Sequence, residues 1–214
     1  MDITEGLIQY LMLIALLTFH EFGHAWTAMK CGDDTARLQG RVSLNPLVHI
    51  DPVGTVLMPL LMIFLPSSVG RFLIGGAKPV PVNPYNLHYP VRDDILVTLA
   101  GPGMNLLLAI VIVGGARIAS VFGSVEVVHM LGQAAHLSLA LCFFNLLVPI
   151  PPLDGSQVIR ALVGMSHEHY ARLARFGYLP VIVFWQFPFV RALVYNMTDA
   201  TFGLIAVCFG FSVG

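Results

Sequence analysis

Residues 16–26 read LLTFHEFGHAW, and this stretch places two histidines and a glutamate inside an otherwise apolar run. It contains the pattern H-E-x-x-H, with His20 and His24 four positions apart. On a helix, residues four apart lie on the same face about one turn apart, so both imidazoles can bind one metal ion. Glu21 follows the first histidine and can take a proton from a water bound to that metal. The stretch therefore predicts a helix that carries a metal site and a general base.

The same residues also have a purely structural interpretation. Two core histidines can hydrogen-bond to backbone groups, and a glutamate can lie near the end of a helix. Uncompensated ionisable groups at membrane depth are costly, however, and they are usually functional. The metal interpretation is favoured, and it requires a third ligand from elsewhere in the chain.

The composition is that of a membrane protein. Of the 214 residues, 57% are hydrophobic and only 11% are charged, and the mean hydropathy of +0.80 lies above the range of ordinary soluble domains. A net charge of −1 gives no basic surface for nucleic acid. The three cysteines, Cys31, Cys142 and Cys208, are too far apart to indicate a disulfide framework or a thiolate zinc site. Any metal must therefore be held by histidine and carboxylate groups.

Apolar runs predict membrane-spanning helices. Gly6 to about Lys30, Ile95 to about Arg117 and about Val127 to Leu147 are each long enough to cross a bilayer core of about 30 Å as a helix. Gly177 to Val194 is expected to be a further span despite its prolines, and Phe202 to Val213 is too short to assign. The predicted fold class is an all-α polytopic membrane protein, a bundle of about four to six transmembrane helices.

The segments between the first two long helices have a different pattern. Ala36 to Leu44 partly alternates between apolar and polar residues, which predicts an extended hairpin. Val53 to Leu65 is apolar but short, and Pro59 interrupts it. The prolines of Gly75 to Pro84 exclude a helix and indicate a second extended loop. We therefore expect short re-entrant or β-hairpin loops associated with the membrane.

The positions of lysine and arginine predict the orientation in the membrane. If the first helix runs inward, the basic residues after it are cytoplasmic, and those near residues 160–175 join them only if the third long helix also runs inward. That arrangement requires Val53 to Ala77 to enter the membrane and return to the same side. We expect a multi-pass protein of a prokaryotic cell membrane, with the active site towards the cytoplasmic side.

Asp154 is the candidate for the third metal ligand. It is the only carboxylate in an apolar, membrane-level context outside the first helix, if Glu126 belongs to the outer loop. Prolines precede it, and an unwound segment can point a carboxylate at a neighbouring helix. Alone, Asp154 reads as an ordinary turn residue before Gly155, but beside the H-E-x-x-H helix the ligand interpretation is favoured. The amide of Asn145 can either donate to a developing oxyanion or hydrogen-bond the broken helix end.

These motifs together resemble the site-2 protease family of intramembrane zinc metalloproteases. The match rests on His20-Glu21-x-x-His24, on Gly101-Pro-Gly-Met-Asn105 and on Asn145-Leu-Leu-Val-Pro-Ile-Pro-Pro-Leu-Asp154-Gly155. The stretches 44–55 and 77–84 also resemble compact prokaryotic members, which lack PDZ and CBS domains. The resemblance covers about residues 10–165. It implies one zinc ion held by His20, His24 and Asp154, with Glu21 as general base, and it suggests transition-state stabilisation by Asn145.

The expected organisation is a single integral-membrane metalloprotease domain over residues 1–214. The catalytic core would span about residues 6–165, and C-terminal helices would span about residues 166–214. Within this region, Gln157 to Gly164 and His167 to Phe176 predict short helices with a polar face.

The resulting hypothesis is an enzyme that hydrolyses peptide bonds in transmembrane segments of other proteins, with a zinc-activated water and Glu21 as base. Its expected partners are a transmembrane protein or peptide substrate and the lipid bilayer, without nucleic acid. One alternative is a membrane metal-ion transporter, a class in which internal repeats are common, and the sequence shows no repeat. A second is a catalytically inactive membrane scaffold, whose usual signature is loss of the glutamate or of a metal ligand.

Overall fold

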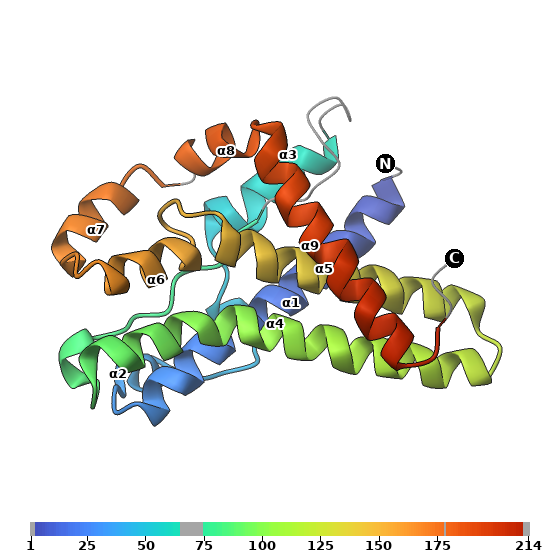
Figure 1. The fold of residues 1–214 in the computed structure, drawn as a ribbon, viewed down its shortest axis with the longest axis horizontal. Coiled ribbons are helices and arrows are strands. Elements are labelled where there is room, and N and C mark those ends of the chain that lie inside the picture. Colours follow the sequence, from blue (N-terminus) through green and yellow to red (C-terminus); the bar gives the residue numbers. More distant parts are fainter. Residues whose placement is uncertain (1–2, 65–74, 178, 212–214) are drawn as a thin grey trace.

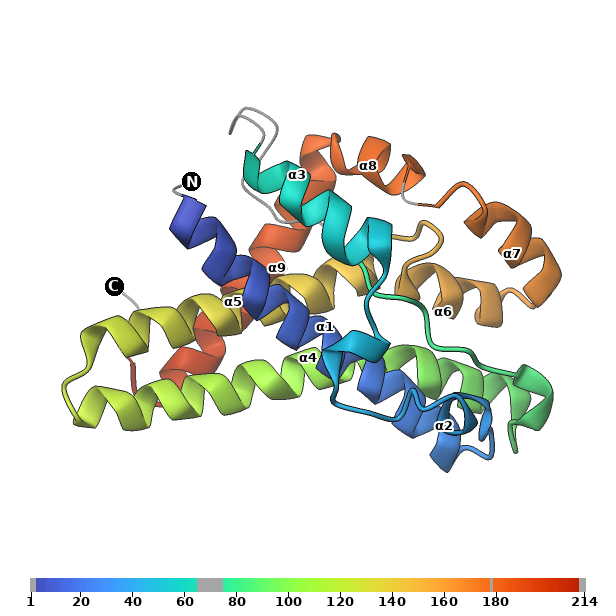
Figure 2. The ribbon, with the colours of Figure 1, turned by 180° about the vertical axis from the view of Figure 1, so that it is seen from behind.

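The computed structural model describes residues 3–64, 75–177 and 179–211, and within these ranges every regular element is helical. Three long helices form the body of the molecule: α1 (Ile3–Lys30), α4 (Pro90–Val121) and α5 (Val125–Leu147). Each is long and apolar enough to cross a membrane. Figures 1 and 2 show α4 and α5 side by side in opposite directions, joined by a short turn, with α1 crossing α4. The predicted all-α bundle is confirmed.

Small residues allow α1 and α4 to pack closely. A Cβ atom built on Gly23 of α1 would lie only 2.7 Å from the carbonyl oxygen of Ala100 in α4. Helices in membranes commonly pack through small residues that let their backbones approach closely. Apolar side chains gain little there by leaving lipid for another helix, so close packing becomes the main source of attraction. The helix α4 begins at Pro90, five residues before the predicted start, and the carboxylate of Asp93 accepts the backbone N–H of Tyr89 at 2.9 Å.

The expected hairpin at Ala36 to Leu44 is wrong, because the chain instead forms the short helix α2 (Thr35–Leu38) followed by turns. Asp33 explains the difference. Its Oδ1 accepts the backbone N–H of Thr35 at 3.1 Å and the hydroxyl of Thr35 at 2.5 Å, which forms a local turn directly before the helix. Gly40, at a φ of 69°, then reverses the chain two residues after the helix ends.

Two arms of the chain connect α2 to α4. The outgoing arm contains η1 (Pro46–Val48), η2 (Pro52–Leu57) and α3 (Met58–Phe64), and the returning arm is the extended segment 75–83 followed by η4 (Pro84–Asn86). The arms are joined by hydrogen bonds from Gly76 N to Gly54 O at 3.0 Å and from Lys78 N to His49 O at 2.8 Å. The extended loop predicted from the prolines is therefore present. The path predicted for Val53 to Ala77 falls partly on residues 65–74, outside the described residues.

The C-terminal third consists of shorter helices that close one side of the bundle. The two short helices predicted there are confirmed as α6 (Asp154–Leu162) and α7 (His167–Ala174). The further span expected from Gly177 to Val194 is not one continuous helix. It is divided into α8 (Leu179–Trp185) and α9 (Pro188–Cys208), which meet at an angle of 83°. Pro188 cannot continue a preceding helix but fits the first turn of a new one.

The described helices therefore give three candidate spans, or four if α8 and α9 count as one broken span. Four is the lower limit of the expected four to six spans, and three lies below it. The helix α9 packs across α5 (Figure 1), and the buried side chains of Phe144, Trp185 and Val194 join α5, α8 and α9 in one apolar cluster. The C-terminal helices thus cover the end of α5 from which the chain continues to Asp154.

Candidate metal centre

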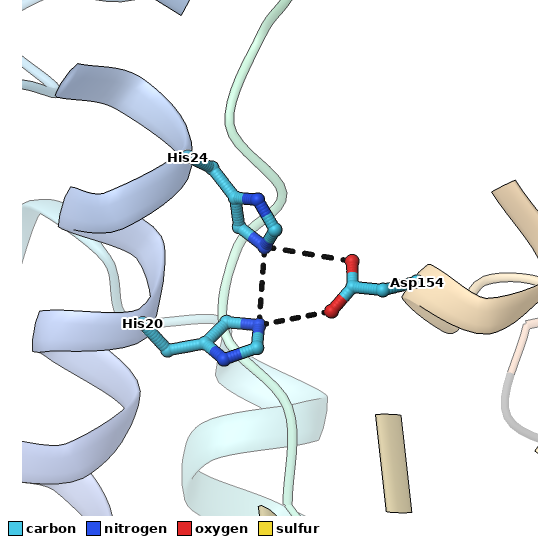
Figure 3. A group of neighbouring side chains, drawn as sticks. All are labelled: His20, His24 and Asp154. Carbon is cyan, nitrogen blue, oxygen red and sulfur yellow. Dashed lines mark hydrogen bonds and ion pairs between the residues drawn. The ribbon is translucent and has the colours of Figure 1, made fainter. Parts of the chain in front are cut away.

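The three predicted ligands converge at one buried point. His20 and His24 lie one turn apart on α1, and Asp154 is the first residue of α6 (Figure 3). The two imidazole Nε2 atoms are 3.1 Å apart. The carboxylate of Asp154 faces both, with Oδ2 at 3.1 Å from His20 Nε2 and Oδ1 at 3.4 Å from His24 Nε2. None of the three residues is more than 8% exposed.

This arrangement fits a bound divalent cation. Ligand atoms around a tetrahedral zinc ion, with bonds of about 2.0–2.2 Å, lie roughly 3.3 Å from one another, which agrees with the three separations above. The two Nε2 atoms and the carboxylate all direct lone pairs at the same point. One proton between them cannot give every lone pair a hydrogen-bond partner. Asp154 Oδ2 is fully buried and has no hydrogen bond of good geometry among the described residues. A cation between the three groups would give each lone pair a partner.

The carboxylate side of the centre is built by the chain break after α5. Prolines at 149, 151 and 152 prevent the helix from continuing, and α6 begins immediately afterwards at Asp154. Gly155 allows α6 to start directly against α5, because a Cβ atom there would collide with the carbonyl oxygen of Leu146. Burial alone would raise the pKa of the Asp154 carboxyl, but the neighbouring imidazoles of His24 and His20 hold it well below its usual range. The carboxylate of Asp154 supplies an oxygen donor opposite the two imidazoles.

The helix α6 is tied to α4 by a buried ion pair between Arg160 and Asp94. Arg160 is 4% exposed and Asp94 is 7% exposed. Since Asp154 and Arg160 lie on the same nine-residue helix, this ion pair fixes the helix that carries the carboxylate ligand.

A cavity of about 360 Å³ adjoins the centre. His20, Glu21, His24 and Asp154 form part of its wall, so the glutamate of the motif faces the same space as the three donor groups. Another part of the wall is the returning arm, through apolar residues that include Val80 and Val82. A molecule in this cavity would meet the donor groups and the glutamate together.

Comparison with known proteins agrees with this geometry. The family model described as Peptidase family M50 matches residues 8–123, which include most of α1, with the H-E-x-x-H pattern, and all of α4. The chain belongs to peptidase family M50. The resemblance to site-2 proteases is thus confirmed, and the chain is a membrane zinc metalloprotease.

The M50 chain is similar to curated proteins from several bacteria. It is 35% identical over 206 residues to "Putative zinc metalloprotease YwhC" of Bacillus subtilis, a match that covers 91% of this chain and 88% of that protein. It is 32% identical over 170 residues to "Putative zinc metalloprotease Rip2" of Mycolicibacterium smegmatis, covering 78% of this chain and 62% of that protein. The Rip2 of Mycobacterium tuberculosis is 36% identical over 141 residues, covering 65% of this chain and 51% of that protein. No solved structure matches the M50 chain.

Asn145 lies at the cavity of the M50 chain but is already engaged. Its side-chain Nδ2 donates to the carbonyl oxygen of Leu141 at 2.9 Å, one turn back within α5 and not at the end of the helix. The amide nitrogen carries two hydrogens, so this bond leaves one of them for another acceptor.

Three cavity residues of the M50 chain were not predicted from the sequence: Asp94, His167 and Tyr170. Asp94 reads as a helix-start aspartate, and the sequence gives no signal that it pairs with Arg160, 66 positions away. His167 lies at the cavity rim, 3.1 Å from an Arg160 nitrogen. Its pKa is lowered by burial and by the charge of Arg160. Tyr170 shares a hydrogen bond of 2.8 Å with Ser156 of α6.

Proposed function

We propose that this membrane zinc metalloprotease hydrolyses peptide bonds within membrane-spanning segments of other proteins. The observation that carries the proposal is the buried group of His20, His24 and Asp154, which lines one cavity with Glu21. Two of these donors and the glutamate lie on a helix long and apolar enough to cross a membrane. The donor groups and the glutamate therefore belong to a segment at membrane depth, which supports a substrate that also lies in the bilayer.

One zinc ion would be held by His20 Nε2, His24 Nε2 and the Asp154 carboxylate. Their mutual distances of 3.1–3.4 Å support a single shared centre. Two histidines and one carboxylate are a ligand set used by catalytic zinc sites. When bound, zinc supplies a Lewis acid that polarises the peptide carbonyl and makes water nucleophilic near neutral pH.

Glu21 is the proposed general base. Its carboxylate accepts the proton of the attacking water and then passes it to the nitrogen of the leaving amine. At 8% exposure, Glu21 is largely screened from bulk solvent, so proton exchange with water outside the cavity is limited. Asn145 would use its second N–H hydrogen to stabilise the negative charge that develops on the carbonyl oxygen.

The substrate must be unwound where it is cut. In a helix, each peptide carbonyl is hydrogen-bonded to the N–H four residues further along and is closely surrounded by side chains. An extended strand leaves the carbonyl open to attack. The apolar wall around Val80 and Val82 suits an unwound segment of a transmembrane protein better than a polar loop.

The proposed orientation places the metal centre towards the cytoplasm. The end of α1, the start of α4 and the helices α6 and α7 lie at one end of the molecule (Figure 1). Six of the basic residues belong to this end or to the segments beside it: Lys30, Arg37, Arg41, Arg160, Arg172 and Arg175. An excess of lysine and arginine marks cytoplasmic segments. The bacterial origin of the relatives supports a prokaryotic cell membrane.

The decisive experiment replaces the base and keeps the ligands. We expect purified Glu21→Gln protein to hold zinc at the level of the unmodified protein and to cleave a membrane-spanning reporter about 10²–10⁴ times more slowly, because the proton acceptor is lost. Zinc content and reporter cleavage are measured on the same sample. Glu126→Gln, at an exposed glutamate of α5, is the matched control and should leave both unchanged.

The same measurement separates the alternatives. A metal-ion transporter would show zinc flux into vesicles that survives Glu21→Gln, and an inactive scaffold would show no reporter cleavage in the unmodified protein. Parental cleavage by Glu21→Gln would refute the assignment of the base.

A further inference from the structure

One stripe of α4 faces the two histidines of α1. It consists of Val97, Gly101 and Asn105, which are four residues apart and therefore lie on one face of the helix. The backbone carbonyl oxygen of Val97 lies 2.7 Å from His24 Nδ1. Gly101 lies opposite both Nε2 atoms, where a Cβ atom would be only 2.6 Å from His20 Nε2. Each imidazole thus has its own hydrogen-bond partner on α4.

Asn105 is the partner of His20. Its side-chain Nδ2 lies 3.2 Å from His20 Nδ1, and the residue is fully buried. The backbone carbonyl oxygen of Asn105 accepts the hydroxyl of Ser138 in α5 at 2.7 Å. Two helices therefore hold this asparagine in place with its amide directed at the imidazole. The side-chain Oδ1 is fully buried and has no hydrogen-bond partner among the residues described by the structure.

The unpaired oxygen has a direct consequence for the metal centre. An N–H group that donates to His20 Nδ1 requires the ring proton on Nε2, and a protonated Nε2 cannot bind metal. Rotation of the amide by about 180° exchanges its two terminal atoms without changing its shape, since amide oxygen and nitrogen are nearly the same size. In that orientation the buried oxygen accepts a proton from Nδ1, and the lone pair of Nε2 is free for the metal.

We propose that Asn105 is a positioning residue for the zinc ligand His20, and that its side-chain oxygen accepts the Nδ1 proton of His20 when zinc is bound. The proposal rests on the proposed function, in which His20 is a ligand. Histidines that bind metals generally donate their other ring N–H to a carbonyl or carboxylate, which fixes the tautomer and the direction of the ring. Asn105 does for His20 what the Val97 carbonyl does for His24. Asn105 lies fifteen residues after the start of α4 at Pro90, at the end of Gly101-Pro-Gly-Met-Asn105, and the spacing along the chain gives no indication of its contact with His20.

The experiment compares two variants at position 105, one with a side chain that accepts hydrogen bonds and one with an apolar side chain of similar size. Asn105→Leu removes the hydrogen bond, and Asn105→Asp keeps an oxygen that can only accept. Zinc affinity is measured in detergent by competition with a chelator, and ligand geometry by the visible absorption of the cobalt(II)-substituted protein. We expect Asn105→Leu to bind zinc about 10–100-fold more weakly and to alter the cobalt spectrum. Asn105→Asp should keep most of the affinity and the parental spectrum.

Ser138→Ala is the control for local packing. It removes the hydrogen bond to the Asn105 backbone but leaves the side-chain amide in place. It should therefore lower the melting temperature while zinc affinity stays close to that of the unmodified protein. Parental zinc affinity in Asn105→Leu would overturn the proposal. So would an Asn105→Asp protein that is folded but binds zinc as weakly as Asn105→Leu.

A measurement on the unmodified protein covers the case in which Asn105→Leu does not fold. With zinc bound, the His20 Nδ1 proton should give an NMR signal that exchanges slowly with water. Exchange as fast as that of an exposed imidazole would overturn the proposal. His20→Ala distinguishes the two levels of inference. Full zinc binding by His20→Ala would contradict the proposed function. Loss of zinc binding in His20→Ala together with full zinc binding in Asn105→Leu would contradict only the proposed role of Asn105.

Discussion

The two sides of the metal centre are built in different ways. The histidine side consists of two long helices in close contact, with Val97, Gly101 and Asn105 of α4 facing His20 and His24. The carboxylate side consists of a nine-residue helix that follows a proline-rich break and is tied to α4 by the ion pair of Arg160 and Asp94. The first side takes its geometry from helix packing, and the second takes it from a turn and a charge pair.

This difference separates metal binding from folding. On the histidine side, a small change can displace the ligands while the long helices keep their contacts. On the carboxylate side, the groups that place Asp154 also hold α6 against α4, so a change there should affect zinc affinity and stability together. Variants on the two sides test this distinction.

The largest effect on zinc is expected from Gly101→Ala. The added methyl group would lie against the Nε2 atoms of His24 and His20. Because the collision is with ring ends rather than backbone, the imidazoles turn away and the helix contact survives. We expect zinc affinity to fall by about 100-fold or more, the upper end for changes around a metal ligand, with little change in melting temperature.

Gly103→Ala is the control for this prediction, since a Cβ atom there meets no other atom within 4 Å. It should leave zinc affinity unchanged. Equal zinc binding by Gly101→Ala and Gly103→Ala would show that the stripe on α4 does not limit the metal centre.

Arg160→Met should have the next largest effect and should lower both zinc affinity and stability. It leaves the carboxylate of Asp94 buried without its charged partner, which typically costs about 3–5 kcal/mol. We expect a lower melting temperature in detergent and weaker zinc binding, because α6 carries Asp154. Arg37→Met provides the comparison, since the ion pair of Arg37 and Asp34 has side chains that are 57% and 48% exposed. An exposed pair contributes about 0–1 kcal/mol. Similar destabilisation by both variants would argue against a special role for Arg160.

Asp33→Asn should have the smallest effect, confined to stability. Burial would raise the pKa of the Asp33 carboxyl, but hydrogen bonds from Thr35, Asn86 and the backbone of Asn83 lower it below its usual 3.8. The carboxylate therefore stabilises the fold above pH 3.8, and this contribution is lost as pH falls through the lowered pKa. We expect Asp33→Asn to be less stable by about 1–3 kcal/mol at pH 7, since one buried donor loses its acceptor.

The pH dependence tests the Asp33 prediction. Thermal unfolding of both proteins is followed from pH 7 downward, and the difference in melting temperature should narrow under acidic conditions. A difference that stays constant with pH would show that the charge of Asp33 is not responsible. Zinc affinity at pH 7 should be the same in both proteins, because Asp33 lies in the segment after α1 and outside the metal centre.

The sequence by itself determined the all-α membrane class, the long apolar helices and the placement of His20 and His24 on one helical face. These features depend on composition and on spacing between near neighbours, which a helix converts directly into geometry. Asp154 was also identified, because few carboxylates occur in an apolar context. The alternating pattern gave a wrong prediction at Ala36 to Leu44, where the turn at Asp33 leads into the short helix α2 and not into the expected hairpin.

Only the tertiary structure decided which groups face the predicted ligands. The contacts of Asn105 with His20 and of Arg160 with Asp94 join residues 85 and 66 positions apart. They depend on how closely α1 approaches α4 and α6 approaches α5, which the absence of side chains at Gly23, Gly101 and Gly155 allows. The spacing of residues along the chain does not predict such distances, because they arise from the packing of one helix face against another.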